Sequence, residues 1–172
     1  MQAGSGARAG VIGLLLIGLG GCQDGGTYGQ QSFRGQYAQA REALEAGKYD
    51  RAAQGYARLL QRAGPLAPRI RLEYAHAQLR GGDYAQAAEQ AEYLASRQEG
   101  AGRAAALAVR GTAQHELGLK AFAAGDARTG QSYLKAAAGA FDEVLKHHPE
   151  LDPLGALAGR NASIKVRLRS GD

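Results

Sequence analysis

Apolar side chains recur at spacings of three and four residues from Gln36 onward, as on one face of an α-helix. Tyr37, Ala40 and Leu44 form the first such face, and further faces follow it as far as Pro149. The composition supports helix as well, because Ala, Leu, Gln, Glu and Arg favour it. Aromatic residues make up only 6% of the chain and Trp is absent, which argues against a β-sandwich. The pattern predicts an all-α fold.

Three similar segments separate these helical faces. They begin at Gly47 (GKYDRA), Gly82 (GDYAQA) and Gly125 (GDARTG), which lie 35 and then 43 residues apart. A Gly lets the chain turn where a Cβ would clash. Asp83 and Asp126 are placed to cap the helix that follows. The sequence therefore predicts helical hairpins that are repeated along the chain.

A helix, a Gly turn and a second helix, repeated about every 34 residues, resemble the tetratricopeptide repeat. Ala52 and Ala87 match the small position of the family's second helix, and Tyr56 matches the aromatic position of the first copy. The third copy departs, with Gly130 at the small position and a longer first helix over about 103–124. The resemblance implies an α–α superhelix of about three hairpins. A generic bundle of four to six helices without superhelical stacking is the alternative.

The first 21 residues have the features of a secretory signal peptide. A positive side chain, Arg8, precedes the apolar run VIGLLLIGL, and the small residues Gly20 and Gly21 follow it. This run is well short of the ~20 residues that a membrane-spanning helix needs. We expect residues 1–21 to be removed on export.

The single Cys of the chain, Cys22, follows directly, and one Cys cannot form an internal disulfide. The four residues LGGC at 19–22 resemble the lipobox of bacterial lipoproteins. That resemblance implies cleavage before Cys22 and acylation of its sulfur and amine, which anchors the chain stably when two or more acyl chains are attached. In enterobacteria an Asp after the lipidated Cys commonly retains the protein in the inner membrane, and here Gln23 stands there. We therefore expect an outer-membrane lipoprotein that faces the periplasm.

The two ends of the repeat region differ from it in pattern. Between Cys22 and Arg34 small and polar residues dominate, which predicts a flexible tether. After Pro153 one more apolar stripe predicts a helix that caps the last hairpin, as stacks of helical pairs require; its residues are Leu154, Leu157, Ile164 and Leu168. The predicted organisation is a signal peptide (1–21), a tether (22–34), a repeat domain (35–150) and a capping helix (151–172).

The chain shows no pattern typical of an enzyme. His115 and Glu116 lack a second His four residues on, so they do not form a zinc motif. Two further His, at 147 and 148, are adjacent on a helix and point in different directions. The net charge of +5 comes from interleaved acids and bases rather than from the concentrated stripe of a nucleic-acid-binding protein. We expect no catalytic residue, no cofactor, no metal and no nucleic-acid partner.

In tetratricopeptide proteins the first helix of each repeat lines a concave groove that binds a peptide. Counted from the turn Gly, the resemblance places these groove positions at Arg34, Tyr37 and Arg41, at Arg69, Leu72 and His76, and at Thr112, His115 and Leu119. The cations among them would make the groove positive at the first two repeats. The paired Asn and Lys of the chaperone-binding members are absent from these positions.

The resemblance thus implies a lipid-anchored periplasmic scaffold or adaptor. It would bind a protein or peptide segment and aid the assembly or localisation of an envelope complex, such as pilus, secretion or cell-wall machinery. We expect a monomer. The alternative is a structural outer-membrane lipoprotein that associates with itself and has no peptide-binding groove.

Overall fold

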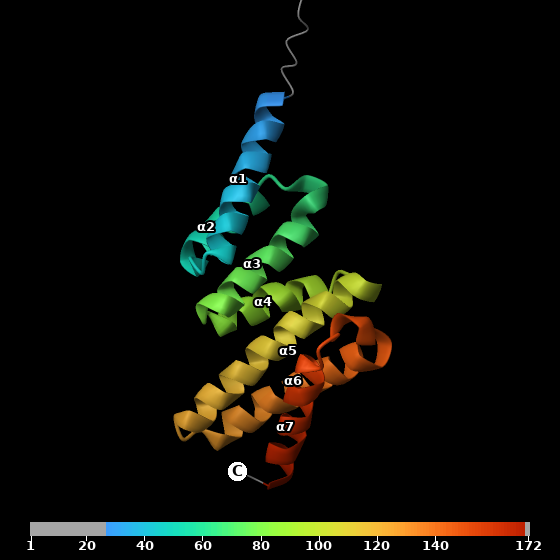
Figure 1. Cartoon of the computed structure of the whole chain (residues 1–172). Coiled ribbons are helices and arrows are strands. Elements are labelled where there is room, and N and C mark those ends of the chain that lie inside the picture. Colours follow the sequence, from blue (N-terminus) through green and yellow to red (C-terminus); the bar gives the residue numbers. More distant parts are fainter. Residues whose placement is uncertain (1–26, 171–172) are drawn as a thin grey trace, which may run out of the picture.

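The computed structural model describes the backbone of residues 27–170 and the side chains from Ser32 onward, and this part of the chain is almost entirely helical (Figure 1). No strand occurs in it, so the predicted all-α fold is confirmed for the described residues. The predicted signal peptide, Cys22 and the first residues of the tether lie outside the described residues. The α-helices are α1 (Thr27–Glu45), α2 (Tyr49–Leu60), α3 (Ala67–Gly81), α4 (Tyr84–Ala95), α5 (Gly100–Ala123), α6 (Ala127–His147) and α7 (Ala156–Ser170).

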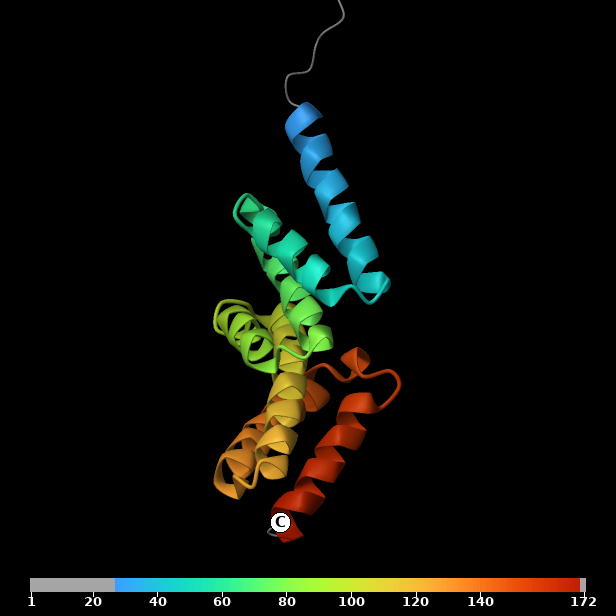
Figure 2. The same cartoon turned by 90° about the vertical axis from the view of Figure 1, so that its left-hand side faces the viewer.

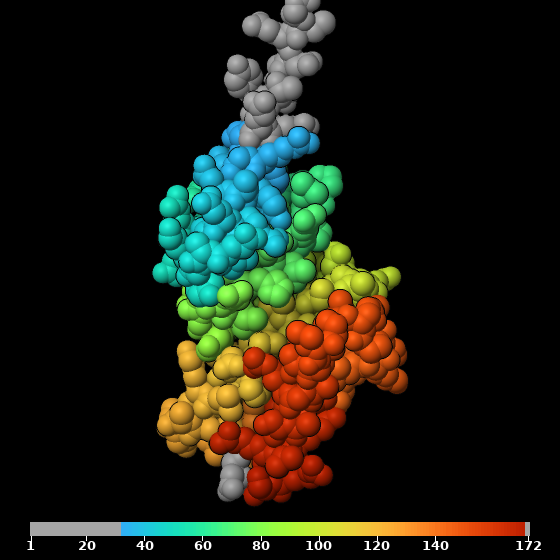
Figure 3. Space-filling view, viewed as in Figure 1, coloured from blue at the N-terminus to red at the C-terminus, as the bar shows by residue number. Residues whose placement is uncertain are grey.

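The helices are stacked in chain order along an elongated molecule (Figures 1 and 2). Each helix packs mainly on the one before and the one after it, and α7 lies on α6 and touches α5. Two short 3-10 helices connect elements, η1 (Gly64–Leu66) before α3 and η2 (Pro149–Leu151) after α6. The surface repeats this order, with α1 and α2 at one end and α5, α6 and α7 at the other (Figure 3). None of the described helices is long and apolar enough to cross a bilayer.

The first helix of each pair ends in the same hydrogen-bonded turn. The predicted turn residues Gly47, Gly82 and Gly125 have φ angles of +73°, +87° and +80°, a region that favours Gly. In each turn the residue after the Gly donates its backbone N–H to a carbonyl five residues back, which satisfies a free carbonyl of the helix end. These bonds, of 2.8, 2.9 and 2.9 Å, run from Lys48 to Ala43, from Asp83 to Gln78 and from Asp126 to Ala121.

The second helix of each pair buries equivalent positions, 5, 9 and 12 residues after the turn Gly. These nine residues are Ala52, Tyr56 and Leu59 in α2, Ala87, Ala91 and Leu94 in α4, and Gly130, Leu134 and Ala137 in α6. Ala52 and Ala87 are fully buried, as expected of small residues at contacts between helices. The three copies read in the sequence are therefore equivalent in their packing as well as in their turns.

The third pair is longer than the other two, as the sequence predicts, with 24 residues in α5 and 21 in α6. Three glycines let these helices approach, because a Cβ at each would come within 2.8 Å of a large side chain on the partner helix. The contacts are Gly111 with Phe141, Gly118 with Leu134 and Gly130 with Phe122. Gly here serves close packing in addition to turning the chain.

The helix caps follow the prediction in one of two cases. The carboxylate of Asp126 accepts a hydrogen bond from the backbone N–H of Thr129 at 3.0 Å, and this bond lowers the pKa of Asp126. Asp83 occupies the same place before α4, but its side chain makes no capping bond. A further cap, which the sequence pattern did not indicate, comes from Asp152, whose two oxygens each accept a backbone N–H of the first turn of α7 at 2.9 Å.

Both ends of the predicted domain need correction. Helix α1 begins at Thr27, so the part of the expected tether over 27–34 is helical. The reason is Phe33, which lies one turn before Tyr37 and packs with it against the first core cluster, so that the apolar face starts earlier. At the other end Leu154 is 93% exposed and does not belong to the apolar stripe of the capping helix. It precedes α7, which begins at Ala156 and packs through Leu157, Ile164 and Leu168.

Candidate functional site

Polar contacts join α1 to α3 at one end of the molecule and α5 to α7 at the other. Glu73 of α3 accepts hydrogen bonds from the Tyr37 hydroxyl and from the Arg41 guanidinium of α1, both at 3.4 Å. Helices α3 and α5 touch each other. Further along, Arg160 of α7 donates to a carboxylate oxygen of Glu116 on α5 at 2.7 Å. We call this row of α1, α3, α5 and α7 the inner face.

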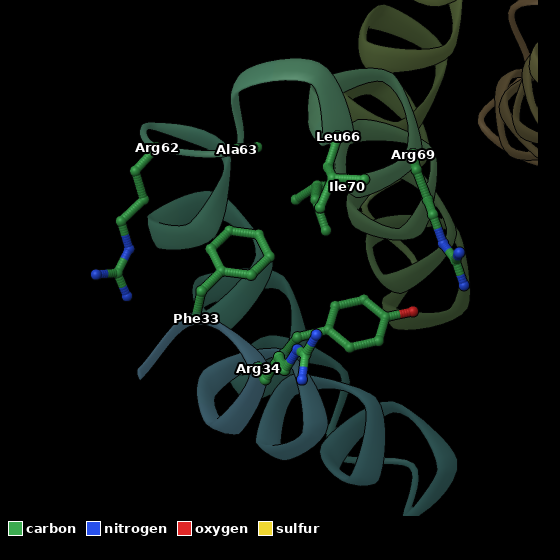
Figure 4. A pocket seen from close by; sticks show the side chains of 8 residues that line it. Phe33, Arg34, Arg62, Ala63, Leu66, Arg69 and Ile70 are labelled. Carbon is green, nitrogen blue, oxygen red and sulfur yellow. The ribbon is translucent and has the colours of Figure 1, made fainter. Parts of the chain in front are cut away.

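A cleft opens on this row between the first half of α1 and the start of α3 (Figure 4). Its volume is about 700 Å³, and the segment that joins α2 to α3 closes one side. The lining residues come from all of these elements and are Phe33, Arg34, Tyr37, Arg62, Ala63, Leu66, Arg69 and Ile70. We call this site the α1–α3 cleft.

Three exposed arginines surround the α1–α3 cleft, and each comes from a different part of the chain. They are Arg34 on α1, Arg62 just after α2 and Arg69 on α3. None of them forms an ion pair with a carboxylate among the described side chains, and the described lining of the cleft contains no acidic residue. Arg62 donates a hydrogen bond to the amide oxygen of Gln36, a neutral partner. No described carboxylate therefore compensates the positive charge of the cleft.

The floor of the cleft is apolar and aromatic. Ile70 is 1% exposed, and Phe33 and Tyr37 are half-buried against the same core cluster. The Tyr37 ring also meets Tyr56 edge to face, with 6.1 Å between the ring centroids. Leu66 stands at the rim and is 49% exposed. Figure 4 shows the side chains of Phe33, Leu66 and Ile70 pointing toward one another.

The structure brings together three of the predicted groove residues and gives a fourth another partner. Arg34, Tyr37 and Arg69 all line the cleft, and the Arg69 guanidinium lies 5.9 Å from the centre of the Tyr37 ring. Arg41 lies outside it and pairs with Glu45 at 2.8 Å and with Glu73 at 3.4 Å. The hydrogen bond with Glu45 is the main reason why the pKa of Arg41 is raised. Arg41 is thus a compensated cation and does not add to the charge of the cleft.

The other predicted positions do not join the cleft. His76 is exposed on α3, whereas Leu72 is half-buried in two core clusters and has a packing role. His115 on α5 is half-buried, and its Nδ1 lies 3.3 Å from the Arg160 guanidinium of α7. The Thr112 hydroxyl donates a hydrogen bond to a backbone carbonyl of its own helix at 2.8 Å, and Leu119 is half-buried. Of the predicted groove positions, Arg34, Tyr37 and Arg69 therefore lie at an open cleft, whereas His115 on α5 is contacted by α7.

Sequence reasoning missed the residues that complete the cleft. The sequence pattern places Phe33 in the tether, and Arg62, Leu66 and Ile70 do not occupy the groove positions of the resemblance. One signal was available, because the stretch 51–72 contains five Arg and no acidic residue. Such an excess of one sign of charge, on a chain whose charges otherwise interleave, indicates a basic surface suited to an anionic partner.

No other cluster in the described chain suggests chemistry. No group of three His, Cys, Asp or Glu side chains is placed to hold a metal ion there. Comparisons of the chain with family models, with curated proteins and with solved structures found no match. Function must therefore be inferred from the residues and their arrangement.

Proposed function

We propose that this chain is a lipid-anchored adaptor of the tetratricopeptide-repeat type, which holds a segment of another protein on its inner face. The observation that carries the proposal is the threefold recurrence of one structural unit. Each copy has the same left-handed Gly, the same hydrogen bond across the turn and the same three buried positions in the second helix. A generic bundle gives no reason for these features to recur in register.

The remaining elements support the same architecture. Helix α7 packs on α6 much as α3 packs on α2 and α5 packs on α4, so it covers the last pair. We take the fold to be an α–α superhelix of three hairpins closed by this capping helix. In such a stack the first helices line the inner face, and the α1–α3 cleft lies on that face.

The anchor gives the adaptor its place in the cell. We infer that Cys22 is lipidated and holds the protein at the outer membrane, facing the periplasm. Cys22 precedes the start of α1 by five residues, which span at most about 18 Å when extended. The inner face would then project into the periplasm from a short connection. An adaptor held in this way aids the assembly or localisation of an envelope complex, such as pilus, secretion or cell-wall machinery.

Exposed apolar side chains near α7 favour one other function. Leu154, which precedes α7, is 93% exposed, and Val166 on α7 is 60% exposed. If two copies associated through these residues, the exposed apolar surface would be covered. The chain would then be the self-associating structural lipoprotein of the alternative hypothesis.

Site-specific photo-crosslinking in living cells separates the two functions. A photoreactive amino acid replaces one of three exposed residues: His76 on the inner face, Lys135 on α6 or Val166 on α7. The adaptor predicts a covalent adduct with another protein from position 76 and no such adduct from position 135. The alternative predicts adducts between two copies of this chain, obtained from position 166. If position 76 gives no adduct with another protein, the proposed function is wrong.

A further inference from the structure

We propose that the α1–α3 cleft binds an acidic segment that carries apolar side chains between its carboxylates. This inference rests on the proposed function in one respect, that the inner face holds a protein segment. It adds the chemistry of the ligand and the residues that recognise it.

The charge of the cleft selects for carboxylates. Arg34, Arg62 and Arg69 approach it from three elements, and no ion pair with a described carboxylate compensates any of them. A guanidinium presents a planar fork of donors that matches a carboxylate in a bidentate geometry. Cations spread around an opening favour several carboxylates along a chain over one isolated anion.

The floor of the cleft selects for an apolar side chain. Phe33 is half-buried and Leu66 is half-exposed, so both present apolar surface to the cleft, whereas Ile70 is 1% exposed and lies behind that surface. An inorganic anion would leave this apolar surface in water, whereas a Phe or Leu side chain would cover it. The volume of about 700 Å³ is within the range of 300–1,000 Å³ that is typical of sites for small organic ligands, and it can hold several side chains.

The recessed position of the apolar surface favours a segment of protein over a membrane surface. Arginines beside exposed apolar residues also occur on proteins that bind anionic bilayers. Insertion into a bilayer requires apolar side chains that project, and Phe33 and Ile70 instead point into the cleft, with only Leu66 at its rim (Figure 4). An extended segment can enter a cleft of this kind.

Fluorescence anisotropy with a defined probe tests the inference. The full chain, purified in a non-ionic detergent, is titrated into a fluorescein-labelled hexapeptide of alternating Glu and Phe. Two matched probes carry Gln in place of Glu, or Ala in place of Phe. We expect each matched probe to bind at least about tenfold more weakly, because each lacks one of the two recognised features. Equal binding of the Gln probe would overturn the inference.

Paired variants locate the binding site. Arg34→Gln combined with Arg62→Gln removes two charges from the cleft, and we expect about a tenfold or greater rise in the Kd of the acidic probe. Arg128→Gln combined with Lys135→Gln removes the same charge from exposed positions of α6 and should leave the Kd unchanged. Equal Kd values for the two double variants would show that the probe responds to net charge alone, and would overturn the inference.

A second variant tests the cleft without removing a cation. Leu66→Glu places a carboxylate at the rim, where it would occupy the arginines in place of the ligand. Since Leu66 is 49% exposed, we expect an unchanged helical circular dichroism spectrum and weaker binding of the acidic probe. Wild-type affinity in this variant would contradict the proposed site.

Two further outcomes separate this inference from its alternatives. In the first, phosphatidylglycerol vesicles bind through Arg34 and Arg62 and the acidic probe does not bind. The ligand of the cleft would then be a membrane surface, and the inference would be overturned. Failure of the probe together with persistent adducts from position 76 would overturn the inference and leave the adaptor intact. Loss of those adducts with retained probe binding would instead overturn the proposed function.

Discussion

Phe141 of α6 lies so close to Gly111 of α5 that a Cβ on Gly111 would come within 2.7 Å of its ring. Phe141 is fully buried, so the ring cannot move away without disturbing its neighbours. A glycine in the middle of a helix costs about 0.5–1 kcal/mol relative to alanine. In the third pair this cost is offset by the close approach of the two helices, which seats a large side chain against the backbone of α5.

Replacing Gly111 with alanine should therefore destabilise the protein, although alanine favours helix. Overpacking of a well-filled core typically costs about 1–3 kcal/mol. Gly139→Ala is the matched control, because Gly139 lies within α6 and a Cβ added there would meet nothing within 4 Å. This control should stabilise the chain by about 0.5–1 kcal/mol. Urea unfolding measures both, and a stabilising effect of both changes would show that α5 and α6 are not in close contact at Gly111.

The small residues at equivalent places in the first two pairs give a second prediction. Ala52→Leu and Ala87→Leu each force a larger side chain into a fully buried position, at a typical cost of about 1–3 kcal/mol. Gln54→Leu, at an exposed position of α2, should change stability little. Thermal unfolding followed by circular dichroism compares the three variants. The same Tm for all of them would mean that Ala52 and Ala87 do not lie at contacts between helices.

The attachment of α7 should weaken in acid. Burial alone would raise the pKa of Glu116, but hydrogen bonds from Arg160 and His115 outweigh it and the pKa is lowered. The pKa values of Asp142 and Asp152 are lowered by hydrogen bonds from Lys165 and from the backbone of Leu157, respectively. Carboxylates with a depressed pKa stabilise the fold above their ordinary values of 4.5 and 3.8, and this stability is lost as pH falls through the folded-state pKa.

Hydrogen exchange of the α7 amides between about pH 5 and pH 3 measures this effect, after correction for the intrinsic exchange rate. We expect protection of α7 to fall before that of α5, because α7 depends more on polar contacts. Glu116→Gln combined with Asp142→Asn should lower protection of α7 at pH 7 and flatten its dependence on pH. A pH dependence as steep as that of the wild type would show that these carboxylates do not hold α7.

The regular part of the fold could be predicted because its signals are local. A turn Gly, a small residue five positions later and an apolar residue four positions after that are read along one stretch of chain, as at Gly47, Ala52 and Tyr56. The same holds for the cap at Asp126, where the interacting groups are three residues apart. Such features depend little on how distant helices are arranged.

The composition of the cleft could be predicted only in part, because it depends on contacts between distant residues. Arg41 pairs with Glu45 one turn along its own helix, but its second partner, Glu73, is 32 residues away on another helix. Arg62 reaches the cleft only because the connection from α2 to α3 folds back toward α1. The groove positions of the tetratricopeptide family lie on the first helices only, so they cannot identify a residue in the connection between two helices.

The proposed lipid anchor is tested by a single change at Cys22, which lies outside the described residues. Cys22→Ser should abolish labelling by an alkyne fatty acid and leave a larger, uncleaved precursor, because the lipoprotein peptidase requires the modified Cys. Immunoblotting against the wild-type chain measures the difference in size. Processing and labelling like those of the wild type would show that the lipobox resemblance is misleading.

Substitutions of two arginines on the inner face should differ in their effects, one lowering stability and the other weakening binding. Arg41 is compensated by Glu45 and Glu73, so Arg41→Gln should lower the Tm slightly and leave the affinity for the acidic probe unchanged. Arg69 has no described carboxylate partner and lines the cleft, so Arg69→Gln should leave the Tm unchanged and weaken binding of the acidic probe. Added salt should slow association with the wild type more than with the Arg69 variant, since exposed charges are screened. If instead Arg41→Gln weakens binding of the probe and Arg69→Gln does not, the ligand binds further along α1 than the cleft.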